Sequence, residues 1–240
     1  MYPEKMTWTP ERIARFWDYV STSPELYFTH QFGAQIVATL KGLTHGKEIL
    51  DYGCGAGHLI SHLIKAGFYV RGADYSEASV KSVADRYAGT SGFLGTSHVD
   101  DLLKCGNQFD TIISAEVIEH LEDDSLSNTL DTYKSLLRPG GILLVTTPND
   151  EDMGVSTVLC PCCNHTFHRW QHVRSWNKDT LAQYFMTAGF KPTRIFATNF
   201  ALPSALQFLQ QIKNFSRIIR SKKPRTLPHL VGIFTLVSEP

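Results

Sequence analysis

Two glutamates and a histidine stand at a spacing that suits metal chemistry. Glu116, Glu119 and His120 follow an apolar run, and if a helix begins there, their i, i+3, i+4 spacing places all three side chains on one face. Two carboxylates and an imidazole are suitable ligands for a divalent cation, Mg²⁺ or Mn²⁺ before Zn²⁺. The alternative interpretation is that the acids stabilise a helix N-terminus and the histidine packs on a sheet.

A second candidate metal site is a segment rich in cysteine and histidine. A tetrahedral structural Zn²⁺ could be bound by Cys160, Cys163, His165 and His168, and it would order a long loop. The alternatives are free cysteines or a redox pair, although no helix N-terminus follows to lower a thiol pKa. Three of the five cysteines lie within four positions here, which suits a reducing compartment better than a disulfide framework.

A glycine-rich turn follows the first strand-like segment, in the run Asp51-Tyr-Gly-Cys-Gly-Ala-Gly57. Open α/β sheets bind nucleotides at such a turn. A dinucleotide fingerprint needs glycine where this chain has His58. The Asp51 carboxylate would repel phosphate but favour an ammonium or sulfonium group. Asp74, which ends the next strand about twenty residues on, is placed to accept hydrogen bonds from ribose hydroxyls. The turn therefore predicts a site for a cationic nucleoside.

Short apolar runs alternate with helical patterns from residue 48 onward. Strands are predicted at 48–52, 69–74, 93–99, 111–115 and 141–147, and helices at 58–65, 76–87 and 124–137. This alternation predicts an α/β fold with a doubly wound, mostly parallel sheet covered by helices on both faces. After a helix at 178–188, segments 193–198 and 230–237 are expected to pair at the end of the sheet and to add one antiparallel strand.

The composition is that of a globular protein without a charge bias. Of 240 residues, 42% are hydrophobic, and 23 basic residues balance 23 acidic ones. No bulk field attracts a polyanion, so nucleic acid is not implied as a partner. The N-terminus lacks an apolar run after a basic start, and no stretch approaches about eighteen apolar residues. A cytoplasmic location is therefore expected.

Four motifs, in order, resemble those of class I S-adenosylmethionine-dependent methyltransferases. They are Asp51-Tyr-Gly-Cys-Gly-Ala-Gly57, Gly72-Ala-Asp74-Tyr-Ser, Phe109-Asp-Thr-Ile-Ile-Ser-Ala-Glu116 and Leu137-Arg-Pro-Gly-Gly-Ile-Leu-Leu-Val-Thr-Thr-Pro148. The resemblance covers residues 47–148 well and about 175–200 loosely. It implies a Rossmann-like fold and S-adenosylmethionine as cofactor, with His98, Asp100 or Asp101 near the adenine. The implied cofactor-binding residues are Asp51, Gly53, Cys54, Gly55, Gly57, Asp74, Tyr75, Asp100, Asp101 and Ala115.

The run Glu116-Val-Ile-Glu119-His120 resembles the Glu-x-x-Glu-His metal motif of two related groups. One group is the ubiquinone-pathway O-methyltransferases, and the other methylates the 2′-hydroxyl at the 3′ end of small RNAs. In the RNA group a further histidine precedes a tryptophan and a helix, and this resemblance implies His172 as fourth ligand. Such an ion would bind the acceptor oxygen, lower its pKa and align it with the methyl group. Without a metal, His120 or His172 could accept the proton.

The chain is expected to comprise an N-terminal helical flank, 1–46, and a methyltransferase domain, 47–240. The domain includes a cysteine and histidine loop, 149–177, and a basic helical insertion, 201–228. The insertion could contact a phosphorylated acceptor, an RNA 3′ end or an anionic membrane carrying a lipid acceptor, or it could be a solvated helix face. Its basic residues are Lys213, Arg217, Arg220, Lys222, Lys223 and Arg225.

These observations predict metal-assisted O-methylation of a hydroxyl on a small-molecule, sugar or lipid acceptor. An RNA 3′-terminal 2′-O-methyltransferase is one alternative, and it would bind RNA with a steep salt dependence. A non-catalytic S-adenosylmethionine-binding scaffold is the other. A scaffold would bind the methyl donor without turnover and would leave the Glu-x-x-Glu-His arrangement unexplained.

Overall fold

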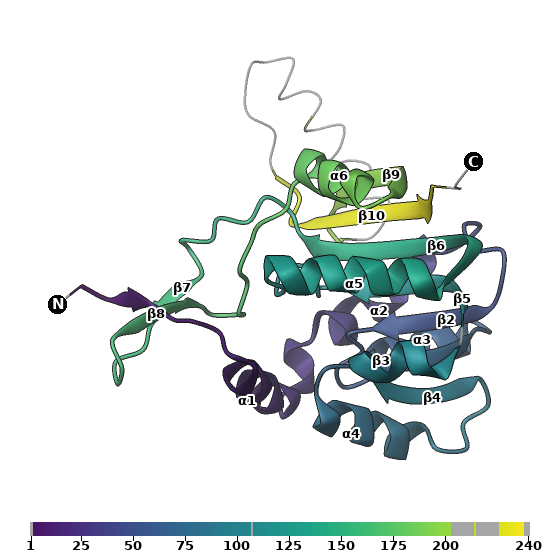
Figure 1. Ribbon diagram of the computed structural model, residues 1–240, viewed down its shortest axis with the longest axis horizontal. Coiled ribbons are helices and arrows are strands. Elements are labelled where there is room, and N and C mark those ends of the chain that lie inside the picture. The colour runs from purple at the N-terminus through teal and green to yellow at the C-terminus, as the bar shows by residue number, and fades with distance from the viewer. Residues whose placement is uncertain (1, 107, 203–213, 215–225, 238–240) are drawn as a thin grey trace.

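The computed structural model describes residues 2–106, 108–202, 214 and 226–237. Its centre is a sheet in the order β4-β3-β2-β5-β6-β10-β9 (Figure 1). The strands are β2 (Glu48–Tyr52), β3 (Tyr69–Asp74), β4 (Phe93–His98), β5 (Phe109–Ala115), β6 (Leu137–Pro148), β9 (Phe190–Thr198) and β10 (His229–Leu236). Within this sheet, β10 runs antiparallel to both of its neighbours, β6 and β9, and the remaining pairs are parallel. The predicted α/β fold with one antiparallel strand is confirmed.

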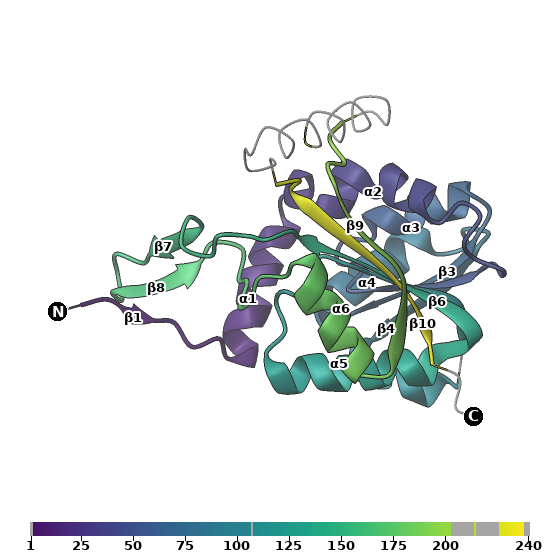
Figure 2. The ribbon, with the colours of Figure 1, turned by 90° about the horizontal axis from the view of Figure 1, so that it is seen from above.

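Helices cover both faces of the sheet, and each face has its own hydrophobic core (Figure 2). One core contains α2 (Phe28–Thr39), α3 (His58–Lys65) and α4 (Glu77–Tyr87), and the other contains α5 (Asp123–Leu136) and α6 (Lys178–Thr187). Successive strand residues point to opposite faces, so Ile49 packs in the first core and Leu50 in the second. Strands buried on both faces are apolar throughout, which makes their positions readable from continuous apolar runs.

The predicted ends of helices and strands agree best with the structure where the local hydrophobic pattern is strongest. Segments 48–52, 58–65 and 69–74 are reproduced by β2, α3 and β3. The largest difference is at β6, which begins at Leu137 rather than at residue 141. The run Arg138-Pro-Gly-Gly follows the end of the preceding helix, and it already belongs to the sheet because Leu137 pairs with Phe109.

The strand order reverses at β2, which pairs in parallel with β3 on one side and β5 on the other. The chain therefore leaves the carboxyl ends of these neighbouring strands toward opposite faces of the sheet. This reversal opens a crevice between the two connections, where open α/β sheets bind their ligands. The glycine turn after β2 and the Glu-x-x-Glu-His segment after β5 both lie at this edge.

A second, small sheet stands apart from the main one and projects from the body (Figure 1). Its order is β1 (Glu4–Lys5), β8 (His165–His168) and β7 (Thr157–Leu159). The segment predicted only as a loop over 149–177 thus contains a β-hairpin. Its strands are too short to show a periodic pattern, and the third strand comes from the distant N-terminus.

The N-terminal flank contains α1 (Pro10–Ser21) and the short 3₁₀ helix η1 (Pro24–Leu26) before α2. The Thr9 side chain caps α1 by accepting from the backbone N–H of Arg12. Most of the predicted insertion, including all six of its basic residues, lies outside the described residues. Within the described part of the chain, no helix is both long and apolar enough to cross a membrane.

Candidate active site

The glycine turn after β2 is packed so closely that side chains are excluded at two positions. Gly53 and Gly55 have φ values of 75° and 50°, in the left-handed region that favours glycine. A Cβ atom on Gly53 would lie 2.4 Å from Val117 Cγ2, and one on Gly55 would lie 2.6 Å from the Tyr27 ring. The turn thus requires glycine, and Tyr27 of the flank covers it.

Asp74 ties the end of β3 to this turn. Its Oδ2 accepts from the backbone N–H of Gly55 at 2.7 Å, and its Oδ1 accepts from that of Ser76 at 2.9 Å. Burial nevertheless raises the pKa of Asp74 above its usual value. A carboxylate has about four acceptor sites, so capacity is left for ribose hydroxyls. That Asp74 accepts hydrogen bonds from the ribose remains a prediction.

Asp51 is buried near the end of β2, only 1% exposed. Its Oδ2 has no hydrogen-bond partner among the described residues. Burial, and then the charge of Asp74, raises the pKa of Asp51 to about 8. A neighbouring cation would favour the ionised form of this carboxyl. The site is therefore consistent with the predicted cationic ligand.

The other predicted cofactor-binding residues surround the same edge. Cys54 and Ala115 are buried, whereas Tyr75, Asp100 and Asp101 are exposed. The two aspartates lie on a 3₁₀ helix, η2 (Val99–Cys105), which follows β4. Their contact with a methyl donor stays a prediction.

The Glu-x-x-Glu-His segment is not helical, contrary to the spacing argument. β5 ends at Ala115, and α5 begins only at Asp123. Glu116 has φ 55°, an uncommon conformation for a residue with a side chain. The His120 N–H then donates to the carbonyl of Val117 at 3.0 Å and closes a turn. The side chains converge because the turn folds back over the sheet edge.

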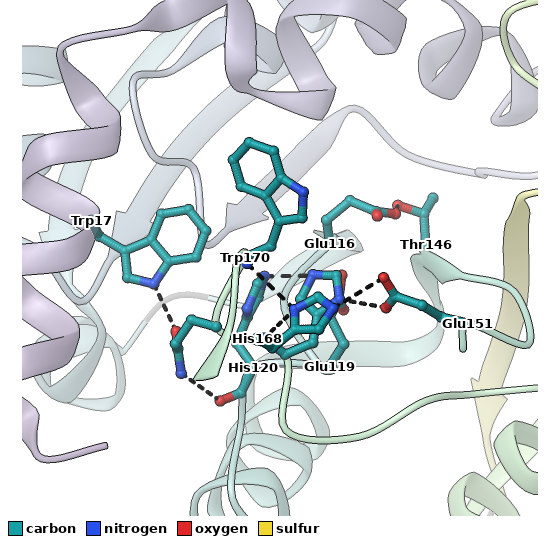
Figure 3. A network of polar contacts seen from close by, with 10 residues as sticks. Trp17, Glu116, Glu119, His120, Thr146, Glu151, His168 and Trp170 are labelled. Atoms are coloured by element: carbon teal, nitrogen blue, oxygen red, sulfur yellow. Dashed lines mark hydrogen bonds and ion pairs between the residues drawn. The ribbon is translucent and has the colours of Figure 1, made fainter. Parts of the chain in front are cut away.

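The structure brings three of the four predicted ligands together. The nearest ligand atoms of Glu119, His120 and His172 all lie within 4.8 Å of one another (Figure 3). Glu116 lies beside this group, with its Oε1 accepting from the Thr146 hydroxyl at 2.9 Å. The four residues therefore lie in one cluster, and their role as metal ligands stays a prediction.

The electrostatics of this cluster fit a divalent cation. Glu119 is 1% exposed, and neither of its oxygens has a hydrogen-bond partner among the described residues. Burial, and then the charge of Glu116, raises the pKa of Glu119 well above its usual value. Burial also lowers the pKa of His120 to about 3, so its ring is neutral and free to bind a metal. A buried carboxylate that accepts no hydrogen bond, beside the neutral His120 ring, is suited to Mg²⁺ or Mn²⁺.

His168 was predicted as a zinc ligand, and the structure separates it from the cysteines. Cys160 and Cys163 occupy the turn of the hairpin, whereas His168 pairs with Thr157 at the opposite end. His165 and His168 are three positions apart on one strand, so their side chains point to opposite faces. The His168 ring stacks on that of His172, with centroids 4.3 Å apart.

The cysteine turn therefore does not assemble the predicted four-ligand set. The backbone N–H groups of Cys163 and Cys162 point toward the Cys160 sulfur and lower its pKa. The His165 Nδ1 instead contacts the Cys163 carbonyl at 2.8 Å. Among the described residues, no group of three clustered ligands includes a cysteine. Zinc binding by the cysteine pair stays a prediction.

Two further contributors were not anticipated from the sequence. The N-terminal flank reaches the site because the Trp17 indole N–H donates to Gln171 Oε1 at 2.9 Å, and Gln171 Nε2 donates to the His120 carbonyl (Figure 3). Glu151, just beyond β6, forms a second group with His168 and His172. Its position after a parallel strand was a usable signal, whereas nothing local in the flank indicated a contact 154 positions away.

The fold and the site together define the class of protein. A sheet whose order reverses at β2, a glycine turn there and an acid at the end of β3 are the features expected of a class I S-adenosylmethionine-dependent methyltransferase. A family model described as a methyltransferase domain matches residues 27–195, and the chain belongs to that family. The protein is an S-adenosylmethionine-dependent methyltransferase.

Known proteins resemble this chain in sequence and in fold. A ubiquinone biosynthesis O-methyltransferase of Dinoroseobacter shibae is 38% identical over 177 residues, which is 69% of this chain and 69% of that enzyme. One of Rhizobium etli is 36% identical over 107 residues, 43% of this chain and 42% of its own length. A Burkholderia thailandensis 1,6-didemethyltoxoflavin-N1-methyltransferase, solved with S-adenosylhomocysteine, has a TM-score of 0.63 at 18% identity, covering 98% of this chain and 94% of that one.

Proposed function

We propose that this enzyme transfers a methyl group from S-adenosylmethionine to a hydroxyl of a small-molecule, sugar or lipid acceptor, with a divalent cation at the acceptor. The observation that carries the proposal is the buried Glu119 carboxylate, which accepts no hydrogen bond among the described residues and lies beside His120 and His172. This cluster lies at the same sheet edge as the glycine turn, so a methyl donor and an acceptor oxygen can meet there.

For the methyl donor, the chain supplies two acids and a glycine turn whose backbone can approach the ligand closely. Asp74 would accept from the ribose hydroxyls with the lone pairs that Gly55 and Ser76 leave free. Asp51 would lie against the positive charge of the methyl donor, which would stabilise its ionised form. Tyr27 lies over Gly55 and helps to close the crevice from the side of the flank.

On the acceptor side, Glu119, His120 and His172 would hold the cation, with Glu116 oriented beside them by Thr146. A divalent ion there would supply the Lewis-acid charge that lowers the pKa of an acceptor hydroxyl. His120 is suited to bind rather than to carry a proton, because burial holds its pKa at about 3. Trp17 packs 4.9 Å from the His120 ring and limits access of water from the flank.

A cavity of mixed polar and apolar lining, which reaches the cluster at His172, supports a small organic acceptor. It has a volume of about 640 Å³, and its lining includes Trp8, Met153, Phe167, His168 and His172. A second cavity, of about 700 Å³ between α5 and α6, contacts none of the predicted site residues. The name of the Dinoroseobacter shibae relative, an O-methyltransferase of ubiquinone biosynthesis, also supports a hydroxyl on a small or lipid-like acceptor.

The other expectations have less support. Membership of a methyltransferase family favours an enzyme over a scaffold. The RNA alternative rests on the shared Glu-x-x-Glu-His motif. The proposed contact with RNA, a membrane or a phosphorylated acceptor rests on basic residues that lie outside the described residues. RNA binding that weakens steeply with salt would support the RNA alternative. A cytoplasmic location remains a proposal.

The test separates the metal from the methyl donor. Wild type, Glu119→Gln and the exposed control Glu77→Gln are titrated with Mn²⁺ and with S-adenosylhomocysteine. We expect Glu119→Gln to lose Mn²⁺ binding while keeping S-adenosylhomocysteine binding, and Glu77→Gln to keep both. Labelled S-adenosylmethionine is then offered with phenolic, sugar and lipid hydroxyl acceptors, with and without chelator. Full methyl transfer in the presence of chelator would eliminate the catalytic cation.

A further inference from the structure

Glu151 lies between two histidine rings at the edge of the proposed metal site. Its Oε2 is 2.5 Å from His172 Nδ1, and its Oε1 is 3.3 Å from His168 Nε2 (Figure 3). The Glu151 side chain is 19% exposed and the two histidine side chains are less exposed than that. Among the described residues, the ion-pair partners of this carboxylate are these two imidazoles. A single acid thus contacts both histidines.

The backbone fixes the protonation pattern of the His168 ring. Its Nδ1 accepts from the N–H of Trp170 at 3.3 Å and from that of His172 at 3.2 Å. A ring nitrogen that accepts a hydrogen bond carries no proton, so the neutral ring must carry its proton on Nε2. That nitrogen faces Glu151. Neither nitrogen of His168 is therefore free to bind a metal, although the residue lies within a group of three candidate ligands.

The same reasoning fixes the tautomer of His172. An ionised carboxylate only accepts hydrogen bonds, so the Nδ1 of His172 must donate to Glu151 Oε2. This leaves the lone pair of His172 on Nε2, so a cation held by the group of Glu119, His120 and His172 would be bound through that nitrogen. Histidines that bind metals commonly donate their other N–H to a carboxylate, which orients the ring and raises its basicity.

We propose that Glu151 is a positioning residue that holds His172 in the tautomer able to bind the cation, and that His168 braces Glu151 and is not itself a ligand. This inference rests on the proposed function, because it concerns the metal site of that proposal. It joins the two groups of candidate ligands, which share His172, into one centre in place of two separate metal sites.

The first measurement is Mn²⁺ affinity, followed by electron paramagnetic resonance in the presence of S-adenosylhomocysteine. We expect Glu151→Ala to weaken Mn²⁺ binding by about 10- to 100-fold, the usual loss when such a carboxylate is removed. His172→Ala removes a ligand and should abolish binding under the same conditions. His168→Phe, which keeps a stacking ring, should weaken binding less than Glu151→Ala does. Glu77→Gln is the matched control.

The second measurement reads the tautomer directly in the metal-free protein. Long-range ¹H–¹⁵N spectra distinguish a protonated Nδ1 from a protonated Nε2. The signals of the His172 ring are assigned as those that are missing from the spectrum of His172→Ala. We expect a protonated Nδ1 in wild type and a shift toward the other tautomer in Glu151→Ala. Unchanged S-adenosylhomocysteine affinity and an unchanged thermal midpoint in Glu151→Ala show that the fold is intact.

The outcomes separate this inference from the proposed function. Absence of Mn²⁺ binding by wild type would overturn both the metal site and the role of Glu151 in it. Mn²⁺ binding by wild type with the same affinity in Glu151→Ala, or a His172 ring protonated on Nε2, would overturn the inference alone. Complete loss of Mn²⁺ binding in His168→Phe would instead make His168 a ligand.

Discussion

Replacing Asp51 by asparagine should make the ligand-free protein more stable and should lower its affinity for the methyl donor. The pKa of Asp51 is raised to about 8 in the folded chain, first by burial and then by Asp74. An aspartate in an unfolded chain has a pKa of about 3.9. Between these two values the unfolded chain releases the proton that the folded chain retains. The folded state therefore loses stability as the pH rises through that window.

The size of the effect follows from the same two values. At pH 7 the solution lies about three pH units above the unfolded pKa, and each unit is worth about 1.4 kcal/mol. Ionisation of Asp51 in the unfolded chain therefore lowers the free energy of unfolding by about 4 kcal/mol. Asparagine has nearly the same shape and no proton to retain. We expect Asp51→Asn to raise the free energy of unfolding by up to about 4 kcal/mol at pH 7 and by little near pH 4.

Binding of the methyl donor should change in the opposite direction. If a cationic ligand requires the ionised carboxylate, wild-type affinity should rise between pH 6 and pH 8 by up to about 50-fold, because the ionised fraction rises by that factor. Asp51→Asn should bind more weakly and lose this dependence. Comparing S-adenosylmethionine with S-adenosylhomocysteine identifies the charge, since only the former carries a sulfonium.

Urea unfolding at pH 4 and pH 7 measures the free energy of unfolding. Calorimetry from pH 6 to pH 8 measures the affinity for the methyl donor. A variant that is less stable than wild type at pH 7 would refute the claim that the buried carboxyl is strained. An identical pH dependence of binding in wild type and Asp51→Asn would refute its role beside the cation. Either result would leave the metal site untouched.

Two other substitutions test the same turn. Asp74→Ala should lower S-adenosylhomocysteine affinity by at least about tenfold, because it removes a charged acceptor; unchanged affinity by calorimetry would refute the ribose role. Gly55→Ala should destabilise the protein by about 1–3 kcal/mol more than Gly67→Ala. Both glycines have positive φ, but only at Gly55 would the new Cβ meet the Tyr27 ring. Equal losses in urea unfolding would show that Tyr27 does not constrain the turn.

The central fold was predictable because its information is local. The strands β2 and β3 and the helix α3 appear in the sequence as apolar runs bounded by turn residues. Their order along the chain, with helices between, permits few arrangements, and a parallel sheet with a reversal at the first strand is among them. Asp51 and Asp74 followed directly, since both lie at the carboxyl ends of neighbouring parallel strands.

The metal pocket was only partly predictable, because its shape depends on contacts between distant segments. The spacing of Glu119 and His120 correctly placed them near each other but predicted the wrong local structure, a helix instead of a turn. His168 was grouped with the cysteines because they are close in sequence. The hairpin separates them, and its third strand comes from β1, whose Glu4 pairs with His165. Trp17 and Gln171 carry no local signal of their contact.

Four unfavourable features of the described structure lie at the edge where the ligands are expected. Glu116 and Gln171 hold positive φ values, and Asp51 and Glu119 keep buried oxygens without partners. Each of these costs stability in the free protein. A ligand that relieves them binds the folded state more tightly than the unfolded one and so raises stability by linkage. A cationic methyl donor near Asp51 and a divalent cation near Glu119 would each do this, which is why the two acids, buried in one crevice, argue for two positively charged partners.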